Sequence, residues 1–268
     1  MKRLLAIEWS KLFYNKTTRN FTIIYFLILL VIGAIMAMIK PEVGGLKLNL
    51  VQLGMFDFPV VWQNVAYVLA IAKIFLAVII ISNITIEYEN STIKQNLIDG
   101  LTKQEFLVSK LMSNIVLAVI STAVVWIIAL VLGFTFSQSD TTFYSGMNYI
   151  LAYFIKMILF FTICSTFSIL LRKTSYAFLG LIAYWIIEGI LSSIDKLLIK
   201  AEFVFSDYLP LSISGRLIPF PDFEIVDFVM GQSAFKISSM SWSVYIMALL
   251  YIGLFAFISG WVLKKRDL

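Results

Sequence analysis

The sequence predicts an all-α fold, that of a polytopic membrane protein with six transmembrane helices in a single domain, residues 1–268. Three observations support this. Hydrophobic residues make up 60% of the chain and charged residues only 14%, with a mean hydropathy of +0.93. Soluble domains average about 45–50% apolar and about 25% charged residues. The apolar residues gather in runs of about 20, and basic residues flank those runs.

Six apolar runs are long enough to cross a bilayer as helices. We place them at about 21–39, 62–86, 111–136, 147–171, 176–194 and 242–263. The first run begins near Phe21, is longer than the core of a secretion signal, and is followed by no Ala-x-Ala site, so we expect it to be a retained helix. Trp242 and Trp261 bracket the last run at a helical separation of about 28 Å, which suits two interfacial aromatic belts.

The distribution of Lys and Arg predicts the orientation. The N-terminus, the 87–110 connection, Arg172-Lys173 and the C-terminal tail together carry 13 of the 21 basic residues. The opposite connections carry six, spread over much longer sequence. Because basic residues are enriched in cytoplasmic loops, we expect a multi-pass protein of the cell inner (plasma) membrane with both termini in the cytoplasm.

The outer connection at 195–241 is the longest segment between runs. It contains Pro210, Pro219 and Pro221 but is still rich in apolar residues. Residues 197–205 and 223–230 are candidates for short amphipathic helices at the outer interface, and an irregular loop is the alternative.

The N-terminal segment, residues 1–20, has the pattern of an interfacial helix. Its apolar residues recur at helical spacing and comprise Leu4, Leu5, Trp9, Leu12 and Phe13. The charged residues on the other faces are Glu8, Lys11, Lys16 and Arg19. We expect the apolar face to lie in the membrane and the cations to face headgroups. The alternative is a positive flank that only orients the first span.

Residues 87–110 form the only long cytoplasmic connection and read as helix–turn–helix. Its apolar stripe consists of Ile93, Leu97, Ile98 and Leu101. Ser91 or Thr92 would cap the first helix, Gly100 would end it, and Thr102 with Glu105 would form a capping box for the next. An amphipathic helix here would either dock into a groove on a soluble partner or rest on headgroups.

The same segment resembles the cytoplasmic connection of the permeases of type-2 ABC exporters. Glu87 and Glu89 match an acidic pair of that family at the end of the second span. The other matching positions are Thr92, Lys94, Leu97, Gly100, Thr102, Lys103 and Lys110. Ser91 stands where glycine is usual, Gly100 where proline is common, and Lys103 where arginine is more frequent. Outside this segment, the N-terminal Glu8, Lys11 and Leu12 and the tail at residues 264–268 also resemble the family.

The resemblance implies a permease subunit of an ATP-driven exporter, working as two permease and two ATPase subunits. Its cargo would be an amphiphilic, peptide, lipid or drug-like molecule moved outward. The sequence has no G-x-x-x-x-G-K-[ST] loop, so ATP and Mg²⁺ are expected on the separate ATPase, and no residue here is expected to be catalytic. A non-transporting scaffold or sensor coupled to the same ATPase remains an alternative.

An intramembrane enzyme is disfavoured by residue usage. The chain has no His and no paired intramembrane Asp, which removes His-ligated metal and aspartyl protease chemistry. The single cysteine, Cys164, lies in an apolar run and is expected to be a buried hydrophobe. We expect no metal, no cofactor on this chain and no nucleic-acid partner.

Three ionisable residues lie within the predicted spans: Lys73, Lys156 and Glu188. A lone charge in the bilayer centre costs at least about 2.5–3.5 kcal/mol, so each should face protein or water. All three can occupy one layer in the outer half of the membrane. We therefore predict that Glu188 pairs with Lys73 or Lys156, either to hold helices together or to line a path for cargo.

Overall fold

The computed structural model describes residues 8–11, 14–36, 38–39, 42–43, 46–47, 50–137, 142–198, 205–224 and 234–266, and for 42–43, 46–47 and 196–198 the backbone only. It confirms the all-α class and six helical segments able to span a membrane. These are α2 (Lys16–Met36), α3 to α4 (Val60–Glu89), α6 (Lys103–Phe136), α7 (Asn148–Leu171), α8 (Thr174–Leu198) and α11 (Trp242–Lys265).

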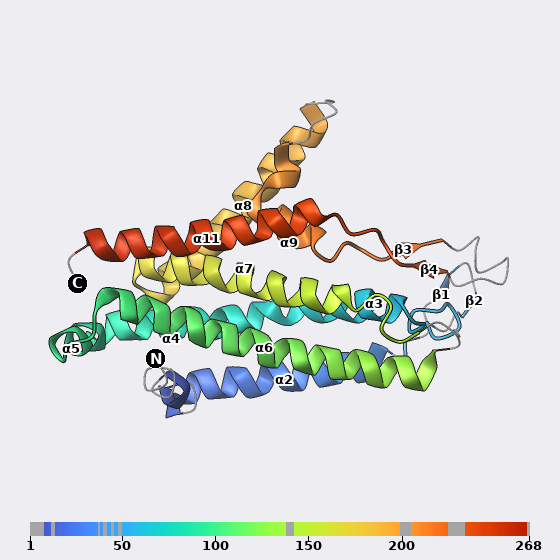
Figure 1. Cartoon of the computed structure of the whole chain (residues 1–268), viewed down its shortest axis with the longest axis horizontal. Coiled ribbons are helices and arrows are strands. Elements are labelled where there is room, and N and C mark those ends of the chain that lie inside the picture. The colour runs from blue at the N-terminus through green and yellow to red at the C-terminus, as the bar shows by residue number, and fades with distance from the viewer. Residues whose placement is uncertain are drawn as a thin grey trace.

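The helices form a bundle around α7. Helix α7 packs against α11, α4, α6 and α8, and α2 lies against α4 and α6 (Figure 1). Helix α8 diverges from the bundle axis, and most of its apolar side chains are exposed in this single chain (Figure 1). The ends of the chain that the structure describes and the short helix α5 (Thr92–Ile98) all lie at one end of the bundle, called here the α5 end.

The second span contains a local change of helix type. Helix α3 (Val60–Leu69) is followed by the 3₁₀ turn η1 (Ala70–Ala72) and then by α4 (Lys73–Glu89). A 3₁₀ stretch within a helix changes the pitch and is a common mark of a functional hinge. Lys73 is the first residue after that turn.

The end of the bundle opposite α5 is less regular. It carries β1 (Glu42–Val43) paired with β2 (Leu46–Lys47), and β3 (Asp222–Phe223) paired with β4 (Phe235–Lys236), both antiparallel. Helix α9 (Pro210–Arg216) and the 3₁₀ helix η2 (Phe205–Tyr208) lie beside α8 and α11. The sequence reading missed α9, although Pro210 at its first turn was a usable signal.

The two short helices proposed in the outer connection, with an irregular loop as the alternative, fall mostly outside the described residues. Helix α8 continues to Leu198, residues 199–204 lie outside the described part, and Phe205 begins a 3₁₀ helix. Phe223 is in strand β3, and 225–230 lie outside the described residues.

The interfacial helix predicted over residues 1–20 is only partly right. Residues 8–11 are helical, but residues from Lys16 onward already belong to α2. The side-chain oxygen of Asn15 accepts a hydrogen bond from the backbone N–H of Thr17 at 3.0 Å, which caps that helix. The predicted apolar residues Leu4, Leu5, Leu12 and Phe13 lie outside the described residues, as do Asp267 and Leu268.

Candidate functional site

The connection between α4 and α6 is a well-capped helix–turn–helix, as predicted. Gly100 adopts φ +96°, and the backbone N–H groups of Gly100 and Leu101 bond to the carbonyls of Leu97 and Asn96, which closes α5 with a Schellman motif. Thr102 and Glu105 form the predicted capping box at the start of α6. The short helix is therefore fixed at its C-terminal end by its own backbone.

The start of α5 differs from the prediction. Ser91 lies at the cap position with φ +56°, in the left-handed region, and its side chain makes no cap hydrogen bond. The hydroxyl of Thr92 donates to the carbonyl of Glu87 at 3.3 Å. The glycine usual in the resembling family fits this position, because only glycine adopts positive φ without steric cost.

Helix α5 has one face on the bundle and one face free within this chain. Ile93 is buried, and Leu97 and Leu101 pack partly against the core. The prediction that Ile98 belongs to the same stripe is wrong, because 86% of its side-chain surface is exposed. Thr92 and Lys94 are exposed beside it.

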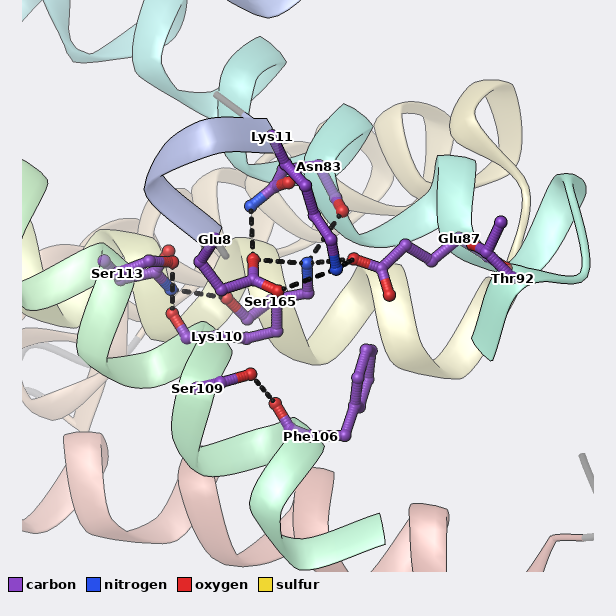
Figure 2. A network of polar contacts seen from close by, with 11 residues as sticks. Glu8, Lys11, Asn83, Glu87, Thr92, Phe106, Ser109, Lys110, Ser113 and Ser165 are labelled. Carbon is purple, nitrogen blue, oxygen red and sulfur yellow. Dashed lines mark hydrogen bonds and ion pairs between the residues drawn. The ribbon is translucent and has the colours of Figure 1, made fainter. Parts of the chain in front are cut away.

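A buried cluster of charges lies where α5 joins the bundle (Figure 2). The Lys110 ammonium donates to Glu8 Oε2 at 2.6 Å, to Glu87 Oε1, and to the carbonyl of Asn83 at 3.2 Å. The Lys11 ammonium donates to Glu8 Oε1 at 3.1 Å and to Glu87 Oε1 at 2.9 Å. We call Glu8, Lys11, Glu87 and Lys110 the charge cluster. It joins the N-terminal segment to the end of α4 and the start of α6.

Burial and charge balance together explain the titration of the charge cluster. Burial by itself would raise the pKa of Glu8, but the Lys110 and Lys11 ammonium groups hold the pKa of that carboxyl below its ordinary value. Burial by itself would lower the pKa of Lys11, but Glu8 and Glu87 raise it. The ion pairs of the cluster thus favour the charged forms of Glu8 and Lys11. Such clusters are strongly destabilised when one partner is removed.

These contacts separate the predicted partner-binding residues into two groups. The first group is held in the charge cluster. Glu87 is buried there and does not present its carboxylate at the surface. Glu8 and Lys11 also bind within the cluster instead of facing headgroups. Trp9 is 38% exposed, as a residue facing lipid would be. The second group, Lys94 and Ile98, is exposed and accessible to a partner.

Two predicted residues bind other helices. Glu89 Oε1 accepts from the backbone N–H and the hydroxyl of Thr174, at 2.8 and 3.0 Å, at the start of α8. The Lys103 ammonium donates to the carbonyl of Arg266 at 2.8 Å, and the Arg266 guanidinium donates to the carbonyl of Leu170 at 2.7 Å. The segment 87–110 is therefore connected to α7, α8 and α11.

The predicted pairing of Glu188 with a lysine is wrong. Glu188 is buried, and its Oε1 accepts from the backbone N–H of Ser212 at 2.8 Å, at the first turn of α9. The Lys73 ammonium instead lies 4.9 Å from the centre of the Phe160 ring. Within the described residues no ion pair joins Lys73 or Lys156 to a carboxylate. The backbone of α9, a helix that was not predicted, thus binds the Glu188 carboxylate in place of Lys73 or Lys156.

The sequence reading named Glu8, Lys11, Glu87 and Lys110 separately and missed that they meet. Asn83 and Glu87 lie four residues apart on one face of α4, so a polar face there was detectable. The N-terminal segment could not be placed against it from the pattern of residues. In the part of the chain that the structure describes, no group of three or more His, Cys, Asp or Glu residues could hold a metal ion.

Helical spans with a charged junction at one end define a polytopic α-helical membrane protein. Residues 50–268 match the family model described as Protein of unknown function (DUF2705), and the chain belongs to that family. A search of curated proteins finds no match.

Proposed function

We propose that this chain is the permease subunit of an ATP-driven ABC exporter and that the exposed face of α5 docks on the ATPase. The observation that carries the proposal is the construction of α5. It presents Ile98 and Lys94 outward, while Ile93 is buried against the bundle and a Schellman motif closes its C-terminal end. An exposed isoleucine beside a charged residue suits a groove on a soluble protein.

The orientation follows from charge. The junction of α7 with α8 and the end of α11 lie at the α5 end, and the basic residues Arg172, Lys173, Lys264 and Lys265 are located there in the chain. With the positive-inside rule, this supports both termini and α5 facing the cytoplasm of the cell inner membrane.

The mechanism is mechanical. ATP and Mg²⁺ bind the partner, whose closure displaces α5. Because α5 is separated from α4 and α6 by only a few residues, the ends of both spans move with it. The charge cluster carries the same displacement to the N-terminal segment, and spans two and three then tilt between inward- and outward-facing states. A second permease subunit, identical or related, would complete the pathway.

Site-specific cross-linking tests the proposal. A photoreactive cysteine adduct at Ile98→Cys in native membranes is expected to capture a chain that contains the G-x-x-x-x-G-K-[ST] loop. The matched control is Ser241→Cys, which is exposed at the opposite end of the bundle and should capture no such chain. Absence of an ATPase at Ile98, or an equal yield at Ser241, contradicts the proposal.

The alternative, a scaffold or sensor with the same ATPase, differs from an exporter because its ATP hydrolysis moves no cargo across the membrane. In the reconstituted complex, ATPase activity that rises with a candidate amphiphile and moves that amphiphile across the vesicle membrane supports export. Stable assembly without movement of any tested cargo supports the scaffold.

A further inference from the structure

Lys73 and Lys156 lie deep in their membrane spans, and in the part of the chain that the structure describes neither has a carboxylate partner. Lys156 is about 12 Å along α7 from its first residue, and Lys73 is about 20 Å from the start of the second span and about 24 Å from its end. Neither residue is near an end of its membrane span, so snorkelling to the interface does not explain them. Both are on helices that pack against each other.

The side chains of Lys73 and Lys156 lie on one face of α7. Lys156 and Phe160 are four residues apart on that helix, so their side chains lie on one face. The Lys73 ammonium lies over the Phe160 ring at 4.9 Å, one helical turn from Lys156. Lys156 is 94% buried and has no hydrogen-bond or ion-pair partner among the described residues.

Among the described residues, no acidic side chain forms an ion pair with either lysine. Helices α2, α3, α7 and α11 contain no Asp or Glu, and the acidic residues of α4 and α6 lie at the α5 end. Glu188 on α8 is engaged by α9. Ionised lysines within a membrane bundle are rare, and they commonly mark a path or a ligand counter-ion. A ligand that carries an anion would supply the partner that the described residues do not provide for these two lysines.

We propose that Lys73 and Lys156 form a binding site for an acidic headgroup, phosphate or carboxylate, carried by an amphiphile that enters from the membrane. The apolar surroundings, including the Phe160 ring, accommodate the chain of the amphiphile, and the two ammonium groups bind its anion by charge-assisted hydrogen bonds. The proposal does not depend on coupling to an ATPase, because it concerns binding to this chain.

Thermal unfolding of the purified chain in a neutral maltoside detergent tests the site. Dodecyl phosphate is the probe, and dodecyltrimethylammonium and inorganic phosphate are the comparison ligands. We expect saturating dodecyl phosphate to raise the unfolding midpoint of the wild type by at least about 5 °C, and neither comparison ligand to do so. Equal stabilisation by inorganic phosphate would overturn the amphiphile and point to a small anion.

The decisive variant is Lys73→Met with Lys156→Met, and the matched control is Lys264→Met with Lys265→Met, which removes two exposed charges. Without ligand, the first variant is expected to unfold at a higher temperature than the wild type, because unpaired buried cations are destabilising. It should lose the stabilisation by dodecyl phosphate, with binding weakened at least about tenfold, while the control retains it.

Stabilisation that is equal in the wild type and the Lys73→Met, Lys156→Met variant overturns the site. If the double variant is not recovered, Lys156→Gln against the exposed control Lys94→Gln makes the same comparison. Lys156→Gln must lose the response to dodecyl phosphate, and a response like that of Lys94→Gln overturns the proposal.

Discussion

At the scale of single residues, Ser91 carries a backbone cost that its side chain does not offset. Its φ of +56° lies in the left-handed region, and no cap hydrogen bond is formed. Ser91→Gly is therefore expected to stabilise the protein by about 1 kcal/mol, measured as the free energy of unfolding by SDS titration in mixed micelles. Ser193→Gly, at an exposed position within α8, is the control and should destabilise. Destabilisation by Ser91→Gly would mean that the serine hydroxyl has a partner.

Lys110 is the most buried member of the charge cluster, with 1% of its side chain exposed. Lys110→Met leaves Glu8 and Glu87 with only Lys11 between them, and we expect a loss of about 3–5 kcal/mol in the free energy of unfolding. Lys103→Met removes an exposed lysine seven residues earlier on α6 and should cost less than about 1 kcal/mol. The double variant Glu8→Gln, Lys110→Met should lose less than the sum of its single variants. Additive losses would contradict a shared cluster.

The pKa values of Glu8 and Lys11 predict how stability depends on pH. The pKa of Glu8 is lowered from 4.5, so its contribution is present above that pH and is lost as the pH falls through the lowered value. The pKa of Lys11 is raised from 10.5, so its contribution is present below that pH and is lost as the pH rises through the raised value. The midpoint difference between wild type and Glu8→Gln is expected to be largest near neutral pH and to shrink in acid. A difference independent of pH would contradict the pairing.

At the scale of elements, the residues of α5 that stabilise the fold differ from those that we propose to contact the ATPase. Ile98 makes little contact with the bundle, so Ile98→Ser should change the free energy of unfolding by less than about 0.5 kcal/mol and yet abolish capture of the ATPase. Leu97→Ser, at the adjacent partly buried position, should cost about 1–2 kcal/mol. Capture is assayed by affinity purification from native membranes. Unchanged capture with Ile98→Ser would remove the exposed face of α5 from the partner interface.

The elements also show what the sequence could predict. Six apolar runs predicted six spans, and the residue pattern around Gly100 and Thr102 predicted the turn and the cap, because those signals are local. Helix ends without such a signal were less certain, since α2 begins several residues before its apolar run, at polar residues that a capped helix tolerates. The partner of Glu188 was wrong because it depends on where α9 lies. That placement is a tertiary property which no local pattern contains.

At the scale of the whole molecule, the bundle has one end rich in fixed charges and one end built from short strands and α9. The α5 end holds the charge cluster and the contacts of Glu89, Lys103 and Arg266. These contacts connect the helices at the end where the proposed ATPase would bind. Lys73 is the first residue of α4, on the α5 side of the 3₁₀ turn at 70–72, and Lys156 lies on α7. A tilt of α4 driven from α5 would therefore change the surroundings of Lys73.

The proposed coupling of α5 to a cytoplasmic ATPase depends on the orientation of the chain in the membrane. That orientation can be tested with variants that each add one cysteine. Cys164 is fully buried, so the wild type should not react with a membrane-impermeant maleimide and serves as the unlabelled control. If the basic α5 end faces the cytoplasm, as the positive-inside rule predicts, Ser241→Cys is labelled in intact cells and Ile98→Cys is labelled only after the membrane is permeabilised. Labelling is read by a mass shift of the purified chain. If Ile98→Cys reacts in intact cells, α5 faces outward, and a cytoplasmic ATPase cannot drive it.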